Sequence, residues 1–142
     1  MATNLNNLGI LLQDQGNYGE ARRYFQRALE MRQAHYPKVR YPQGHPNLAI
    51  SLSNLGDLLQ AQGDYGEARG YYQRALEMTQ ALYPREQYPQ GHPHLALCLD
   101  NLGFLLQEQG NYGEARGYHQ RALEMTQALY PREQYPLSLI HI

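Results

Sequence analysis

Apolar residues recur along the chain at helical intervals, and the pattern is clearest just after His45-Pro46. There the leucines stand at intervals of four, three and four residues, at positions 48, 52, 55 and 59. This spacing puts them on one face of a helix. Proline suits the first turn of a helix and glycine commonly follows its last turn. We therefore predict a helix from Pro46 to about Gln62, ended by Gly63.

A second helix is predicted directly after the first. Asp64 precedes Glu67 by three residues, as in a capping box, and Asn17…Glu20 and Asn111…Glu114 repeat the spacing. One side of this helix is expected to carry Ala68, Tyr71, Ala75, Met78 and Leu82. Tyr83-Pro84 should end it, because a residue before proline avoids helical geometry. The proline-containing stretch 83–93 is then a connector. No segment alternates with a period of two, so no strand is predicted.

These two helices belong to a unit that is repeated along the chain. Asn-Leu-Gly recurs at 7–9, 54–56 and 101–103, which is a period of 47 residues, and 48–89 is identical to 95–136 at 35 of 42 positions. We predict a single array over 1–136 with repeats 1–47, 48–94 and 95–136. The first helix of each repeat is called helix A and the second helix B. The mid-helix glycines Gly9, Gly56 and Gly103 imply close packing of helix B, with Ala21, Ala68 and Ala115 as the expected partners.

The residues of the repeat resemble the tetratricopeptide pattern, although 47 residues exceeds the usual ~34. The resemblance rests on Leu55-Gly56, on the block Gly63-Asp64-Tyr65-Gly66-Glu67-Ala68, and on Tyr72 with Ala75-Leu76-Glu77. The Asn-Leu run, the Gln-Arg-Ala-Leu block and the His-Pro before helix A resemble the kinesin-light-chain type. Gln33, Gln80 and Gln127 replace the proline that usually ends helix B, so helix B should extend toward Tyr36, Tyr83 and Tyr130. The resemblance implies an all-α, right-handed superhelical solenoid of three helix-turn-helix repeats with six helices.

Composition excludes several classes of function. The formal net charge of −1 argues against a nucleic-acid partner, and the lack of 18 consecutive apolar residues argues against a membrane span. The start of the chain lacks the basic and apolar regions of a signal peptide, and the single cysteine, Cys98, fits a reducing compartment, so we expect a cytoplasmic protein. His92-Pro93-His94 could present two imidazoles, but neither these nor Cys98 has an evident catalytic or metal-binding partner. We expect no enzyme activity, no metal and no cofactor.

Variation between the repeats is concentrated on helix A. Repeats 2 and 3 differ at seven of the 42 positions, and five of these lie in helix A. Four of the five, at 50, 53, 57 and 61, form one helical stripe. Drift on a merely tolerant face is one explanation, and selection for a ligand is the other. In the family that the chain resembles, helix A lines a concave groove that holds peptides, and the stripe corresponds to groove positions.

Two rows of amides lie beside the stripe. The resemblance matches Asn7, Asn54 and Asn101 to the position that often holds a peptide backbone, and an amide can both donate to and accept from such a ligand. Hydrogen bonds within the array are the alternative role. Gln13, Gln60 and Gln107 would add a second polar row. The complete predicted peptide-binding set is Asn6, Asn7, Ile10, Gln13, Ile50, Ser53, Asn54, Asp57, Gln60, Leu97, Asp100, Asn101, Phe104 and Gln107.

Charge narrows the expected partner. Helix A contains no Lys or Arg in any repeat, whereas it carries Asp14, Asp57, Asp100 and Glu108. A neutral-to-basic peptide is therefore favoured over an acidic one, with Ile10, Ile50, Leu97 and Phe104 as apolar contacts. We expect a non-enzymatic protein–protein interaction scaffold. The alternative is a structural spacer or self-associating array without a specific ligand.

The end of the sequence departs from the repeat. After Tyr135-Pro136 the stretch Leu137–Ile142 replaces the Gln-Gly-His-Pro of the earlier copies. It resembles the in-frame translation of a transposon end used in sequencing libraries, so we expect 137–142 to be a non-native tail and the natural protein to carry further repeats. Helix B of the third repeat would leave its next-repeat face uncovered, so we expect end fraying or end-to-end self-association.

Overall fold

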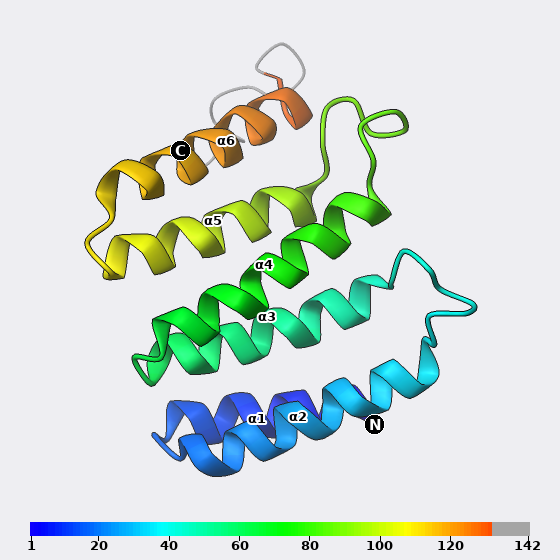
Figure 1. Ribbon diagram of the computed structural model, residues 1–142, viewed down its shortest axis with the longest axis vertical. Coiled ribbons are helices and arrows are strands. Elements are labelled where there is room, and N and C mark those ends of the chain that lie inside the picture. Colours follow the sequence, from blue (N-terminus) through cyan, green and yellow to red (C-terminus); the bar gives the residue numbers. More distant parts are fainter. Residues whose placement is uncertain (132–142) are drawn as a thin grey trace. The chain divides into compact units, whose positions relative to one another are not determined.

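The computed structural model describes residues 1–131, which form six helices and contain no strand (Figure 1). In chain order these are α1 (Ala2–Asp14), α2 (Tyr18–His35), α3 (Pro46–Ala61), α4 (Tyr65–Leu82), α5 (Pro93–Glu108) and α6 (Tyr112–Leu129). Each predicted repeat supplies one pair, so α1, α3 and α5 are the A helices and α2, α4 and α6 the B helices. The all-α helical-repeat prediction is confirmed. The expected tail at 137–142 lies outside the described residues.

The chain divides into two compact units, Met1–Leu82 and a second that begins at Tyr83. In the first unit α1 packs on α2, α3 packs on α4, and α2 also packs on α3. Its core is built from Phe25 and Leu29 of α2, from the α3 leucines, and from Tyr72 and Leu76 of α4. In the second unit α5 packs on α6. Each unit is therefore organised around A/B helix pairs.

The A helices begin and end as the sequence predicts. His45 caps α3 through its side chain, with Pro46 as the first helical residue. At the other end Gly63 has φ +83°, its N–H donates to the carbonyl of Gln60, and the N–H of Asp64 donates to that of Leu59. This pair of bonds is a Schellman motif, for which a glycine in the left-handed region is the usual residue. The tight A-to-B turn is thus encoded by the recurring Gln-Gly.

The B helices extend as predicted, but two local predictions about them are wrong. Helix α2 ends at His35 with Tyr36 as its C-cap, and α6 ends at Leu129 with Tyr130 in the same position. The capping boxes at 17–20 and 111–114 do not form, because neither asparagine side chain accepts a cap hydrogen bond. Instead the Asn17 amide donates to the Glu20 carboxylate at 3.0 Å. At the start of α2 this side-chain hydrogen bond takes the place of the predicted hydrogen bonds between side chain and backbone.

The buried face of helix B is also rotated from the predicted one. Helix α4 buries Ala68, Tyr72, Ala75, Leu76 and Thr79, whereas Tyr71, Met78 and Leu82 are only half-buried. The sequence pattern assigns Tyr71 to the buried face of the helix. Its ring instead lies partly at the surface, where Arg74 stacks over it with its Cζ atom 5.5 Å from the ring centroid. Tyr72 takes the interior position instead.

The mid-helix glycines have a different partner from the expected alanines. A Cβ built on Gly56 would come within 2.7 Å of the Tyr72 ring, and one on Gly9 would come equally close to Phe25. Gly103 lies in the same way against His119, at 2.6 Å. The alanines at 21, 68 and 115 are buried, but it is the ring at the A/B crossing that excludes a side chain. This ring position, 25/72/119, also organises the candidate site.

Candidate functional site

The fourteen predicted residues all lie on A helices, nine of them in the first unit and five in the second. Their exposure is uneven. Asn7, Asp57 and Gln107 are exposed, most of the others are half-buried or exposed, and Asn6 is buried. The set therefore combines side chains that can reach a ligand with side chains engaged in the fold, and the two kinds have to be separated.

The row of asparagines is available for binding. Asn7 is exposed and Asn54 and Asn101 are half-buried. Within residues 1–131 none of these three side-chain amides has a hydrogen bond to another residue of the chain, unlike the Asn47 amide, which donates to the Tyr36 hydroxyl at 3.1 Å. The alternative, that these asparagines tie the repeats together, has no hydrogen bond in support among the described residues. A polar group left open in this way can be satisfied by water or by a ligand.

The predicted apolar contacts are exposed. Ile10 and Ile50 are 44% and 46% exposed, and Phe104 and Leu97 are 53% and 59% exposed. Isolated surface apolar residues are ordinary, but these four occupy related positions on the three A helices. Phe104 also makes an edge contact with His119, at 4.7 Å between ring centroids. Its orientation is therefore partly fixed from helix B.

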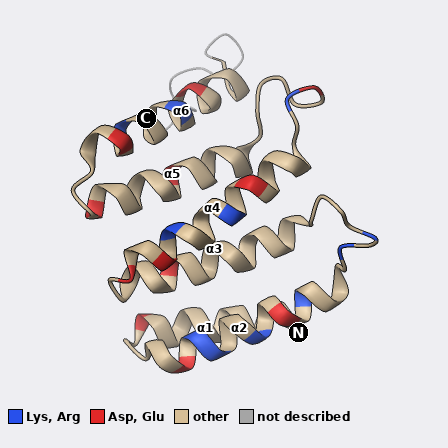
Figure 2. Ribbon diagram, viewed as in Figure 1, with Lys and Arg blue, Asp and Glu red and all other residues tan. Residues whose placement is uncertain are grey.

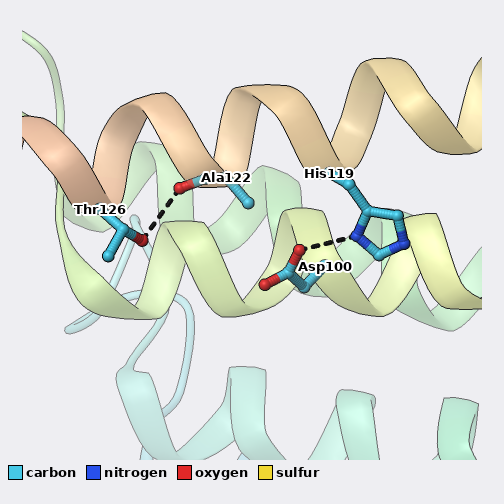
Figure 3. A network of polar contacts seen from close by, with 4 residues as sticks. All are labelled: Asp100, His119, Ala122 and Thr126. Atoms are coloured by element: carbon cyan, nitrogen blue, oxygen red, sulfur yellow. Dashed lines mark hydrogen bonds and ion pairs between the residues drawn. The ribbon is translucent and has the colours of Figure 1, made fainter. Parts of the chain in front are cut away.

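Asp100 is engaged in a polar contact across the A/B crossing of the second unit. Its Oδ1 lies 2.8 Å from Nδ1 of His119, as Figure 3 shows. The Nε2 atom of His119 is buried and has no hydrogen-bond partner. Figure 3 also shows the hydroxyl of Thr126 on α6 donating to the carbonyl of Ala122, at 2.9 Å. Asp100 is thus both a candidate ligand contact and a partner of helix B.

Asp57 has the corresponding role in the first unit. The Tyr72 hydroxyl lies within hydrogen-bond distance of two acceptors, the Asp57 carboxylate and the Gln60 side-chain oxygen, the latter at 2.9 Å, and its single hydrogen can be donated to either. Desolvation raises the pKa of Asp57 above its ordinary value, and the hydrogen bond from Tyr72 acts in the opposite direction. The Asp57 carboxylate is therefore held in place by its contact with Tyr72 and is not free to move toward a ligand.

Part of the helix-A variation is explained by this ring position. In repeat 2 Asp57 contacts Tyr72, and in repeat 3 Asp100 and Phe104 both contact His119. Phe25 has no polar atom to offer, and in its repeat the Oδ1 atom of Asn6 is buried without a partner. Sequence reasoning missed Tyr72 and His119 as partners. The signal was present, because 72/119 is one of the seven positions that differ between repeats 2 and 3.

Charge is distributed between the helices as predicted. Figure 2 shows Lys and Arg on α2, α4, α6 and the connectors, and none on α1, α3 or α5. The structure adds one cation that the sequence did not reveal. Arg32 of α2 is 8% exposed and donates to the Asn47 carbonyl at 2.8 Å, to the Ser51 hydroxyl at 3.0 Å and to the Thr3 hydroxyl at 3.3 Å.

Arg32 therefore links three helices of the first unit. Burial lowers its pKa, the opposing influence of Tyr36 being smaller. The other repeats have Thr79 and Thr126 at this position, and that exchange was the sequence signal for a special residue. The acceptors are neutral oxygens, so Arg32 keeps its charge, but the guanidinium is buried between the helices and is not displayed on the helix-A surface.

The connector histidines act as helix caps. His92 Nδ1 accepts from the N–H of His94 at 3.1 Å, and its ring stacks on Tyr83 with centroids 3.6 Å apart. His45 repeats both contacts, with Asn47 and Tyr36 as partners. Burial lowers the pKa of both imidazoles, assisted by His94 in one case and by His35 and then Arg32 in the other. Through residue 131, no three His, Cys, Asp or Glu side chains are grouped so that they could hold a metal ion.

The helix pairs, the glycine–ring crossings and the repeated caps define a helical-repeat protein. The sequence model of the tetratricopeptide repeat family matches residues 2–47 and 95–134, and a second tetratricopeptide repeat model matches residues 40–81. The chain belongs to the tetratricopeptide repeat family. Repeats of this family typically act as non-enzymatic scaffolds for protein–protein interaction.

A solved structure is similar over most of the chain. It is the crystal structure of BtubC (BKLC) from P. vanneervenii, a kinesin-light-chain-like protein, with 26% sequence identity and a TM-score of 0.75. The match covers 92% of this chain and 48% of that one, so the chain spans about half of its length. The resemblance to the kinesin-light-chain type of repeat is thereby confirmed. No curated protein matches the sequence.

None of the helices in residues 1–131 is both long enough and apolar enough to cross a bilayer.

Proposed function

We propose that the helix-A surface binds an extended or helical peptide segment of a partner protein, and that the chain is part of a larger repeat protein. The observation that carries this proposal is the row Asn7, Asn54 and Asn101, whose amides have no partner in the described chain. Each amide offers two donor hydrogens and an acceptor oxygen. The row can therefore hold peptide groups without breaking any bond of the fold.

The charge of the surface supports a neutral-to-basic ligand. The A helices contain no Lys or Arg, and they carry Asp57 and Asp100 beside exposed apolar side chains. Complementary potentials select among partners and exclude like charges. We include no catalytic residue, metal or cofactor in this function.

The test uses an array of immobilised peptides, each made with Lys, Ser or Asp beside its apolar residues. We expect the chain to bind Lys and Ser versions in preference to Asp versions. Asp57→Asn with Asp100→Asn should weaken the Lys versions by about fivefold, since an exposed ion pair contributes up to ~1 kcal/mol. Asparagine keeps an acceptor for Tyr72 and His119, so the fold is retained, and Asp57→Lys with Asp100→Lys should weaken binding further.

Asp64→Asn is the matched control for Asp57→Asn alone, because Asp64 lies in the turn between α3 and α4 and outside the predicted set. It removes a negative charge without touching the helix-A surface. Unchanged affinity of the Asp57 and Asp100 variants, or an equal loss in Asp57→Asn alone and in Asp64→Asn, would contradict the proposed site. Asn54→Ala and Asn101→Ala should weaken all three peptide versions alike, since a backbone contact does not depend on ligand charge.

The alternative, a self-associating array, is favoured by two exposed leucines. Leu11 is 53% exposed, whereas its counterpart Leu58 is fully buried, and Leu123 is 52% exposed, whereas its counterpart Leu29 is 3% exposed. Such surfaces can pair head to tail. Sedimentation should then show association that increases with concentration and is reduced by Leu123→Lys. A monodisperse monomer at high concentration would exclude this alternative.

A further inference from the structure

A pocket of about 680 Å³ lies in the first unit, away from the helix-A surface. It is bordered by α2, the connector that follows it, the first half of α3, and α4. None of the fourteen predicted site residues lines it. The pocket is therefore distinct from the peptide site proposed above.

The pocket has an apolar floor and a charged rim. Leu29, Leu48 and Leu52 form buried parts of the floor, and the exposed side chains of Lys38, Arg74 and Glu77 stand around it. Neither cation forms an ion pair with another described residue, and Arg74 is held over the ring of Tyr71. The rim thus carries one more positive than negative charge.

Packing fixes the shape of the connector wall. Tyr36 and Tyr41 line the pocket, and Tyr36 stacks on His45 with ring centroids 3.7 Å apart. Gly44 has φ +88°, and a Cβ there would come within 2.6 Å of Met78. The pocket is therefore formed before any ligand arrives.

The residues that line the pocket are retained in the next repeat more strictly than the residues around them in the sequence. Of the fourteen lining residues, thirteen have an identical residue 47 positions later, and the fourteenth, Lys38, becomes Arg85, which keeps the charge. Between 29 and 44 the other four differences fall outside the lining, at positions 32, 35, 39 and 40. Packing accounts for the retained floor. It does not account for exposed Gln43, or for the positive charge kept at the exposed position 38/85.

We propose that this pocket binds a segment of a partner protein that presents a large apolar side chain next to a carboxylate. The volume lies in the range of ligand sites. The leucine floor can take the apolar side chain, and the unpaired Lys38 and Arg74 can take the carboxylate. This charge preference is opposite to that of the helix-A surface, so the chain has two faces that select different partners.

The experiment uses three of the four methionines as reporters, with Met78 in the pocket and Met1 and Met31 outside its lining. The full chain, labelled at the methionine methyl groups, is titrated with three probes and followed by NMR. The probes are acetyl-Ser-Asp-Leu-Asp-Ser-amide, the same peptide with Lys for Asp, and the same peptide with Ser for Leu. We expect a saturable shift of the Met78 signal with the first probe, at constant Met1 and Met31 signals, and several-fold weaker binding of the other two.

Matched charge reversals test the rim. Lys38→Glu with Arg74→Glu should weaken the first probe by about tenfold, as loss of two exposed ion pairs implies. Arg27→Glu with Arg40→Glu makes the same change of net charge, with Arg27 at the position in repeat 1 that Arg74 holds in repeat 2, and neither residue lines the pocket. This control should leave the titration unchanged.

Several results would overturn the proposal. No saturable Met78 shift up to the solubility of the first probe, equal shifts with the Lys probe, or equal losses in the two double variants would each do so. A Met78 shift that grows with protein concentration in the absence of peptide would assign the pocket to a second copy of the chain. The proposed helix-A site is tested separately, because the Asp57 and Asp100 variants should leave this titration unaffected.

Discussion

The ring of Tyr72 occupies the space that a side chain on Gly56 would need, since a Cβ there would come within 2.7 Å of the Tyr72 Cε1 atom. The missing side chain at Gly56 therefore makes room for the ring at the A/B crossing. Phe25 and His119 fill the same space above Gly9 and Gly103. The residue at position 25/72/119 of helix B thus influences the spacing of the two helices. It also determines which polar groups of helix A are in contact with helix B.

Gly56→Ala should destabilise the chain despite the better helix propensity of alanine. Because the Tyr72 ring is enclosed in the core, the extra methyl must displace it, and overpacking of this kind costs about 1–3 kcal/mol. Gly70→Ala is the matched control: Gly70 lies inside α4 with open space at its Cβ position, so this change should stabilise by ~0.5–1 kcal/mol. Denaturant unfolding measures both. A stabilising effect of Gly56→Ala would show that the contact with Tyr72 is not restrictive.

Most of the fold could be predicted because its determinants are local. The leucine interval of α3, Pro46 at its start and Gly63 at its end each act within a turn or two of chain, and repetition supplied the same evidence three times. The buried face of α4 was misplaced for a physical reason. Tyrosine is amphipathic, so the pattern could not tell surface Tyr71 from interior Tyr72, and the decisive contact with Gly56 lies on another helix.

The buried Arg32 should contribute to stability mainly through the oxygens that depend on it. Arg32→Met would leave the Ser51 hydroxyl and the Asn47 carbonyl without this donor, at a cost of about 1–3 kcal/mol. Adding Ser51→Ala should then cost less than it does in the original chain, which a double-mutant cycle of unfolding free energies measures. Strictly additive effects would mean that the 3.0 Å contact between Arg32 and Ser51 is energetically unimportant.

Tyr72→Phe should raise the pKa of Asp57 further. The hydrogen bond from the Tyr72 hydroxyl opposes the upward effect of desolvation on this carboxyl, so removing the hydroxyl leaves desolvation unopposed. NMR titration of the Asp57 carboxyl carbon gives the pKa directly. Tyr71→Phe is the control, since Asp57 takes its hydrogen bond from Tyr72, and it should leave the titration unchanged. A lower pKa in Tyr72→Phe would contradict the assigned direction.

The candidate site was only partly accessible to sequence reasoning. The repeat comparison pointed to Ile50, which is exposed, and the family resemblance pointed to Asn54, whose amide has no partner among the described residues. Their role in binding stays a prediction. The same comparison could not separate variation that serves a ligand from variation that serves the fold, because Asp57 and Asp100 vary together with a residue 15 or 19 positions later. Such coupling across a helix hairpin becomes visible only when the two side chains are placed in space.

Stability should fall as the pH decreases below about 6.5, the ordinary pKa of histidine. Burial lowers the pKa of His45 and His92 in the folded chain, so between the folded and unfolded values the unfolded state binds more protons. The stabilising contribution is present above pH 6.5 and is lost as the pH falls through the folded values. Protonation also removes the Nδ1 acceptor from the first turns of α3 and α5 and places a positive charge at their positive ends.

Replacing both caps by His45→Asn and His92→Asn isolates this effect. Asparagine is a good N-cap that does not titrate, so the difference between unfolding midpoints at pH 7.5 and 5.5 should become smaller than in the original chain. His35→Asn is the comparison, because its ring caps no helix and lowers the pKa of His45 as a smaller cause than burial, so it should reduce the pH dependence less than the double cap variant does. If the pH dependence is unchanged in the double cap variant, or is reduced equally by His35→Asn, the capping imidazoles are not its source.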